Sequence, residues 1–180
     1  MKRILFLVII SMLALNSNAQ KQKPATQFNK NTQTIKFGIG AGFNGIPVEV
    51  SYEHGFKDNL FGVSNLNLGL GGYLGYYGYS EDFGNWGKYK YRNYVLGVRG
   101  TFHYTFVPKL DTYAGLLLGY DISTSKWDGD EGYDGHADGA GGLVIGGVVG
   151  ARYQFNPKWG VYAELGYSVA WGTIGISYKL

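Results

Sequence analysis

From Thr34 onward, hydrophobic and polar residues alternate along the chain with a period of two. Between Tyr94 and Phe106, for example, large apolar residues occupy almost every second position and small or polar residues fill the others. This is the period of a β-strand, whose successive side chains point to opposite faces. The pattern predicts eight strands, at about 34–43, 46–56, 62–77, 89–107, 110–122, 140–155, 158–168 and 171–180.

Two kinds of connection join the predicted strands. Short polar turns are expected at 57–59, 107–109 and 156–158, and they alternate with connections of varying length at 44–45, 80–88, 122–139 and around Ala170. Short turns at one end and longer loops at the other are typical of barrels that span an outer membrane, where the short turns face the periplasm.

The residue types on the two faces of the strands indicate which face points inward. Most of the 30 glycines fall on the polar face, and small residues are needed where space is short, inside a narrow barrel. Aromatic residues on the apolar face gather near both strand ends, as in the two aromatic belts of membrane proteins. The sequence therefore predicts an all-β fold, an eight-stranded antiparallel up-and-down transmembrane β-barrel over residues 34–180. The alternative is a soluble ligand-carrying barrel with its apolar face inside.

The first 19 residues have the features of a signal peptide. Lys2 and Arg3 precede the apolar run 4–15, and small residues at 17–19 favour cleavage before Gln20. The apolar run is too short for a membrane helix, which needs about 20 residues. We expect export through the Sec pathway, followed by a disordered periplasmic leader over residues 20–33.

Composition removes several classes of function. The chain has no Cys, which excludes disulfides and thiolate chemistry. Its formal charge is +3, and without Lys2 and Arg3 it carries 14 basic and 13 acidic residues, a balance that gives no case for nucleic acid as a partner. Gly40, Gly42 and Gly45 match a dinucleotide-binding fingerprint by letter, but a strand follows where a helix would be required.

Charged residues recur on the inward face of the predicted barrel. Because unpaired charges away from water are costly, we expect a salt-bridged network that fills the lumen, with ion conduction or catalysis as the alternatives. A structural role is also favoured for its histidine, although neighbouring threonines would allow a base with a hydroxyl partner. The network comprises Lys36, Glu49, Glu53, Arg99, His103, Asp111, Arg152, Glu164 and Lys179, with Tyr113 nearby in the pattern.

The connection 122–139 is long and acidic. Carboxylates alternate with glycines between Asp128 and Asp138, and oxygen ligands of this kind suit Ca²⁺. Gly139 stands where a calcium-binding loop of the EF-hand type has its bidentate Glu, so a solvated acidic loop is favoured. The loop is a candidate contact for an extracellular ligand or, through divalent cations, for lipopolysaccharide phosphates. We expect no catalytic, metal-binding or cofactor-binding residues.

The last predicted strand carries a further pattern, with outward apolar residues that end on a large one. With the strand count and loop alternation, residues 34–180 resemble the small outer-membrane barrels of the OmpA/OmpX type, in the form without a peptidoglycan-binding domain. Members of that family usually end on Phe, so Leu180 departs from the pattern. The resemblance implies a signal read by the barrel-assembly machinery, formed by Ile174, Ile176, Tyr178 and Leu180.

The resemblance also implies a place in the bacterial outer membrane, in contact with its lipid and lipopolysaccharide. Members serve as structural proteins, adhesins or narrow channels, so the expected function is a structural or surface-interaction role without enzymatic activity. A narrow porin-like channel is the alternative. A small lipid-modifying enzyme is less favoured, because no amphipathic helix precedes the first strand and none of the three histidines is followed at plus two by Ser.

Overall fold

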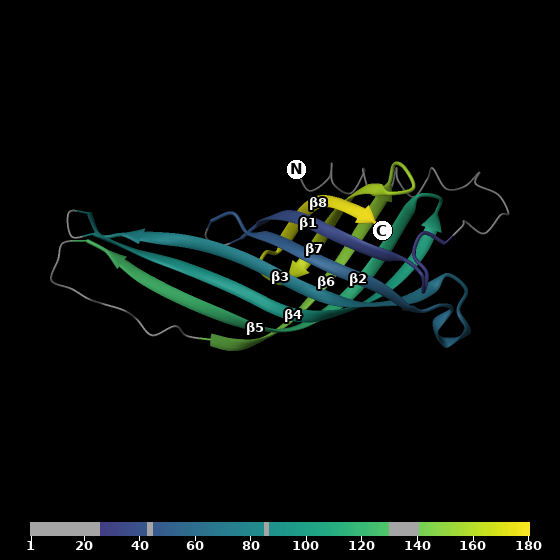
Figure 1. Ribbon diagram of the computed structural model, residues 1–180, viewed down its shortest axis with the longest axis horizontal. Coiled ribbons are helices and arrows are strands. Elements are labelled where there is room, and N and C mark those ends of the chain that lie inside the picture. The colour runs from purple at the N-terminus through teal and green to yellow at the C-terminus, as the bar shows by residue number, and fades with distance from the viewer. Residues whose placement is uncertain (1–25, 43–44, 85–86, 130–140) are drawn as a thin grey trace, which may run out of the picture.

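The computed structural model describes residues 26–42, 45–84, 87–129 and 141–180. Eight strands form one closed antiparallel barrel in which each pairs with its sequence neighbours and the first pairs with the last (Figure 1). The predicted fold class is confirmed. The strands are β1 (Gln33–Ala41), β2 (Val48–Lys57), β3 (Leu66–Asp82), β4 (Lys88–Val107), β5 (Leu110–Asp128), β6 (Gly141–Gln154), β7 (Trp159–Tyr167) and β8 (Gly172–Lys179).

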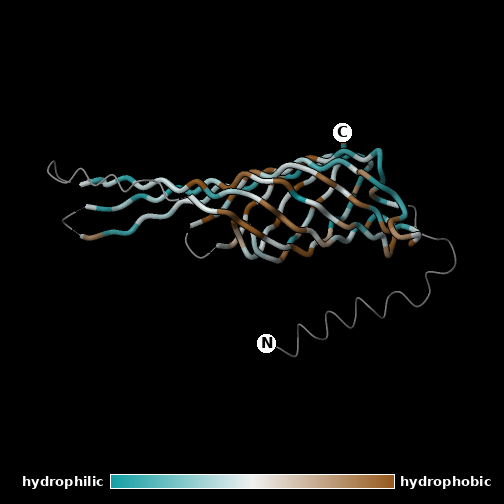
Figure 2. The backbone as a smooth tube through the Cα atoms, turned by 90° about the horizontal axis from the view of Figure 1, so that it is seen from below, coloured by the Kyte–Doolittle hydropathy of each residue, from teal (hydrophilic) through white to brown (hydrophobic). Residues whose placement is uncertain are grey.

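β3 and β5 extend beyond their predicted ends at residues 77 and 122, and together with β4, found close to its predicted range, they rise beyond the rest of the barrel (Figures 1 and 2). The pairing of β3 with β4 continues to Asp82 and Lys88, and that of β4 with β5 continues to Lys88 and Asp128. The expected loop 80–88 is therefore shorter than predicted, since residues 80–82 belong to β3 and Lys88 to β4. The expected loop 122–139 begins only after Asp128. We call the extension, residues 77–82, 88–93 and 123–128, the blade.

Cross-strand aromatic contacts explain why the blade forms strands despite its many charges. The rings of Tyr79 and Tyr91 stack with centroids 4.7 Å apart, and those of Tyr89 and Trp127 lie 4.8 Å apart. Such pairs are the stabilising unit of an antiparallel sheet. Residues 80–82 and 123–128 of the blade had been expected in loops, whereas residues 89–93 had been expected in a strand.

The connection between β2 and β3 also departs from the prediction. A short 3-10 helix, η1 (Leu60–Gly62), occupies the start of the strand expected at 62–77. Asn59 and Asn65 have positive φ angles of 51° and 67°, and the side chain of Asn59 accepts a hydrogen bond from the backbone N–H of Asn65. These asparagines close a compact connection, so β3 begins only at Leu66. No helix among the described residues is long and apolar enough to cross a membrane.

The two faces of the wall differ as the alternation predicted. Outward side chains such as Leu116 and Ile145 are 67% and 68% exposed, whereas inward charged ones such as Arg152 are buried. An apolar outer wall around a polar interior is the arrangement of a transmembrane barrel. In Figure 2, hydrophobic and hydrophilic positions are interspersed along the barrel strands, while the blade is mostly hydrophilic.

Inward glycines provide space for long side chains from nearby strands. A Cβ atom at Gly38 would lie 2.2 Å from the Tyr162 hydroxyl. A Cβ at Gly150 would lie 2.7 Å from the Tyr113 ring and 2.9 Å from Glu164. The lumen is thus filled by side chains, which fits the narrow interior of an eight-stranded barrel.

Candidate functional site

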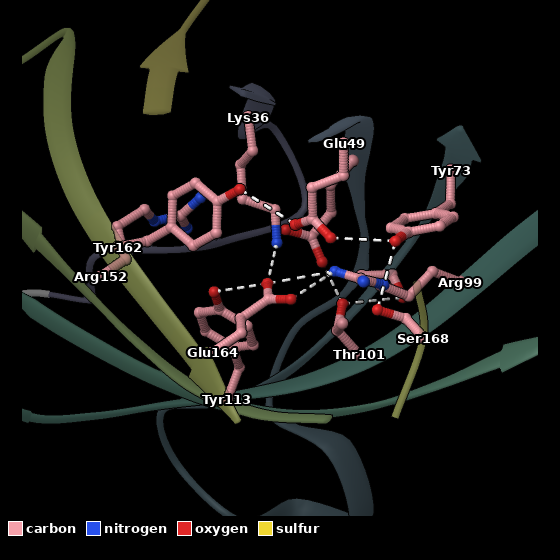
Figure 3. Close-up of polar contacts among 12 residues, drawn as sticks. Lys36, Glu49, Tyr73, Arg99, Thr101, Tyr113, Arg152, Tyr162, Glu164 and Ser168 are labelled. Atoms are coloured by element: carbon pink, nitrogen blue, oxygen red, sulfur yellow. Dashed lines mark hydrogen bonds and ion pairs between the residues drawn. The ribbon is translucent and has the colours of Figure 1, made fainter. Parts of the chain in front are cut away.

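The side chains inside the barrel form successive layers between its two ends, and each layer contains different chemical groups. We call the end with the short β4–β5 and β6–β7 turns the turn end, and the end from which the blade rises the loop end. Figure 3 shows the polar side chains of opposite walls converging on one another across the lumen.

Nearest the turn end lies a cluster around His103 of β4. Its Nδ1 is 2.9 Å from an Asp111 oxygen and its Nε2 is 2.9 Å from a Glu53 oxygen. Arg152 of β6 donates to Asp111 at 2.6 Å, and the hydroxyl of Thr101 donates to Glu53. All five side chains are buried, so the imidazole lies between two carboxylates, and the guanidinium contacts one of them, with almost no water contact.

Glu164 of β7 forms the centre of the next level. Its carboxylate accepts hydrogen bonds from the Lys36 ammonium at 2.7 Å, from Arg99 at 3.0 Å and from the Tyr113 hydroxyl at 2.8 Å. The Lys36 nitrogen also lies 4.7 Å from the Tyr113 ring centroid. One carboxylate thus serves two cations, and hydrogen bonds to a buried charge of this kind are the strong class.

Glu49 and an apolar layer complete the filling toward the loop end. Glu49 accepts hydrogen bonds from the hydroxyls of Tyr73 at 2.9 Å and Tyr162 at 3.0 Å. Tyr73 then packs with Val95, Leu117 and Val169 in the hydrophobic cluster of the interior. We call these four residues the apolar layer.

Residues 26–32 enter the barrel from the turn end. Phe28 is fully buried, and its ring stacks on His103 with centroids 3.7 Å apart and an interplanar angle of 12°. The expectation of a disordered leader over residues 20–33 is therefore wrong from residue 26 onward, because a lumen niche buries the one large apolar side chain of that segment. The predicted signal peptide and residues 20–25 lie outside the described residues.

Eight of the nine expected lumen residues contact one another or the tyrosines between them. Lys179 does not join any ion pair among the described residues; its ammonium donates to the backbone oxygen of Gln27 at 2.6 Å. Tyr73 and Phe28 also fill the lumen and were not among the predicted lumen residues. The inward parity of Tyr73 in β3 could have indicated its place, whereas nothing in the sequence marks Phe28 as a lumen residue.

Asp111, His103 and Thr101 have the spacing of an acid, a base and a hydroxyl nucleophile, with His103 Nε2 3.0 Å from the Thr101 hydroxyl. A nucleophile of this kind must meet its substrate. Here the three side chains are 0–1% exposed and Phe28 covers the imidazole, so the arrangement holds the wall together rather than offering a reaction site. Among the described residues, no group of three or more His, Asp or Glu side chains is arranged so that it could hold a metal ion.

A cleft of about 210 Å³ opens at the loop end, above the apolar layer. Tyr77 and Tyr79 of β3 form one side, and Tyr167 and Trp171 flank the β7–β8 connection on the other. Val169 and Ala170 also line it. Val169 belongs both to the apolar layer and to the lining of the cleft, and none of the charged interior residues lines the cleft.

The blade carries its charges in water. Lys90 and Asp128 form an ion pair at 2.5 Å with side chains 44% and 52% exposed. The hydrogen bond from Lys90 lowers the pKa of Asp128 below its ordinary value. Residues 122–128 of the expected ligand-binding loop are strand, and residues 130–139 lie outside the described part of the chain.

Comparisons with known proteins place this geometry among membrane barrels. The N-terminal β-barrel domain of Pseudomonas aeruginosa OprF is 15% identical with a TM-score of 0.56, covering 85% of this chain and 100% of that one. Ail, the attachment invasion locus protein of Yersinia pestis, in complex with the heparin analogue sucrose octasulfate, is 12% identical with a TM-score of 0.52, covering 83% and 97%.

A structure from the de novo design of transmembrane β-barrels is 20% identical with a TM-score of 0.51, covering 89% of this chain and 100% of that one. The fold is that of a small transmembrane barrel. At these identities the likeness establishes the fold alone. Neither a protein-family model nor a curated protein sequence matches the chain.

Proposed function

We propose that this protein is an integral barrel of the bacterial outer membrane with a closed lumen, and that its blade and mouth cleft contact ligands outside the cell. The observation that carries the proposal is the filling of the lumen by Phe28 at the turn end and by the apolar layer toward the loop end. A lumen filled in this way supports a structural or surface-interaction role better than conduction.

The blade supports the surface-interaction role. Its inward-parity face presents Tyr79, Tyr91 and Trp127 above the cleft, and rigid aromatic side chains with a polar edge are efficient contact residues. Its opposite face places Lys90 beside Lys126, on the parity of the outward residue Tyr94. Cations just beyond the apolar wall suit anionic lipid or lipopolysaccharide groups.

Conductance of the refolded protein in planar bilayers tests the closed lumen. We expect no stable single-channel current, because the interior side chains leave no continuous water path. Stable ion-selective current from the unmodified barrel would replace this proposal with the narrow-channel function.

Deletion of residues 124–138 tests the role of the blade. It joins Ser123 to Gly139 next to the paired residues Ile122 and Gly141, so the barrel keeps its closure. We expect the variant to fold, as judged by different mobility in SDS before and after boiling, and to lose any adhesion that the full-length protein confers on cells. Adhesion that is unchanged in the folded variant would exclude residues 124–138 as part of the contact surface.

Export and assembly complete the proposal: the signal peptide directs Sec export, and the last strand is read by the barrel-assembly machinery. Leu180 is 65% exposed on the outer wall, and Tyr178 packs against Trp159 at 4.7 Å. Replacing both Tyr178 and Leu180 with Asp places charges against lipid. We expect the double variant to disappear from the outer-membrane fraction; normal abundance there would show that this strand is not the signal.

A further inference from the structure

The N-terminal segment 26–32 closes the turn end of the lumen through a small set of contacts. Phe28 supplies its one buried large side chain, between the His103 ring and the Arg152 guanidinium, whose carbon lies 5.6 Å from the Phe28 centroid. The ring covers an ion pair that would otherwise face the turn end. Phe28 is thus placed as a cover over the charged interior.

Hydrogen bonds hold the rest of this segment against four different parts of the barrel. The backbone N–H of Gln27 donates to Thr105 at 3.1 Å, and the Phe28 oxygen accepts from Asn67 at 2.5 Å. Lys179 donates to the Gln27 oxygen, and the N–H of Lys30 donates to Asp58 at 2.8 Å. These contacts join β4, β3, β8 and the β2–β3 connection to one short segment.

The segment adds no strand to the barrel wall, since β1 begins only at Gln33 and the eight strands close without residues 26–32. Only Thr32 continues the wall pairing, through a hydrogen bond from the Gly55 N–H to its backbone oxygen at 2.8 Å. The rest of the segment is held by one ring and a few hydrogen bonds, whereas the wall has continuous backbone pairing. Segments with few buried contacts open locally at lower free energy than a paired sheet.

From this difference we infer that residues 26–32 are a releasable stopper, and that their release opens the lumen to the turn side as a blind charged pocket. The pocket is blind because the apolar layer of Tyr73, Val95, Leu117 and Val169 stays in place toward the loop end. Release exposes His103, Asp111 and Arg152 to solutes on the turn side without making a channel through the membrane. The stopper is a property of the turn end and is independent of any ligand at the blade.

A single introduced thiol reports on this opening, because the chain has no Cys of its own. Ser177 is inward-facing, 1% exposed and two residues from the stopper contact Lys179. In the Ser177→Cys protein in lipid vesicles, we expect slow modification by a small charged methanethiosulfonate reagent. Adding Phe28→Ala should raise the modification rate by about tenfold or more, because the rate follows the open population.

Two further variants serve as an independent test and as a control for this experiment. Gly55→Ala leaves Phe28 intact but places a Cβ 1.8 Å from the Asn29 backbone oxygen, so it should displace the stopper and raise the rate as well. Phe61→Ala removes a ring that is 85% exposed at the same end and should leave the rate unchanged. Each variant is compared only after its heat-dependent mobility in SDS shows a folded barrel.

Planar-bilayer recordings of the same variants separate a blind pocket from a gate. We expect Phe28→Ala and Gly55→Ala to remain non-conducting while their thiol becomes reactive. An unchanged modification rate in both variants would show that residues 26–32 do not control access. Stable current through either variant would overturn the blind pocket and show that the apolar layer does not close the loop end.

Discussion

Two ion pairs of nearly equal length lie in opposite surroundings in this protein. Arg152 and Asp111 meet at 2.6 Å in the lumen, where both side chains are 0% exposed. Lys90 and Asp128 meet at 2.5 Å on the blade, where they are about half exposed. Water screens the second pair and solvates each partner once the pair breaks, whereas a lumen charge that loses its partner has no such replacement. The distance between charges therefore says little about stability until burial is known.

The largest effect is expected from Arg152→Ala, which leaves Asp111 without its guanidinium partner. We expect the free energy of unfolding in lipid vesicles, measured by denaturant titration, to fall by about 3–5 kcal/mol. Lys90→Ala on the blade is the matched control. Equal losses for the two variants would show that water enters the lumen and would remove the contrast between the regions.

Glu164→Gln tests the central level, where one carboxylate serves Lys36 and Arg99. The amide retains an acceptor oxygen but removes the charge, so we expect a loss of about 1.5–3 kcal/mol in the same titration. Glu81→Gln, at an exposed carboxylate of the blade, is the control and should change the unfolding free energy by less than about 0.5 kcal/mol. If Glu164→Gln also lowered the unfolding free energy by less than about 0.5 kcal/mol, Lys36 and Arg99 would not need an anionic partner.

Removing both members of the lumen pair sharpens the comparison. The double variant Arg152→Met with Asp111→Leu removes both charges of the pair but also the Asp111 partner of the buried His103 Nδ1, so it should lose about 1–3 kcal/mol, less than Arg152→Ala. A loss equal to that of Arg152→Ala alone would mean that the pair itself, and not the penalty for an orphaned charge, stabilises the barrel.

The smallest effect is expected from titrating the blade pair. Since the pKa of Asp128 is lowered in the folded protein, its contribution is present above the unfolded pKa of about 3.9 and is lost as pH falls through the lower folded value. Because both partners are half exposed, the melting temperatures of the unmodified protein and of Asp128→Asn should change in parallel between pH 7 and pH 3. A loss of melting temperature confined to the protein that retains Asp128 would show that the blade pair stabilises the fold.

Much of this architecture follows from residue order alone. Alternation in segments such as 94–106 determines which side chains share a face, because strand geometry allows only two directions. Glycines on the polar face indicate which face lies inside. The inward charges of β4 and β6 were therefore identifiable, although their partners were not: parity places Arg152 and Asp111 in the lumen but does not pair them.

Tertiary structure alone decided three features. Cross-strand ring pairs such as Tyr79 and Tyr91 stabilise the blade. Which rings pair depends on the strand register, and the register cannot be read from the local sequence. Glu164 became a centre for two cations because β1, β4 and β7 meet across a closed barrel. Phe28 is buried beside His103 in a space that exists only once the barrel has closed, and no local sequence pattern indicates this position. Alternation is a local property of the backbone, whereas these contacts join residues far apart in sequence and exist only once the barrel has closed.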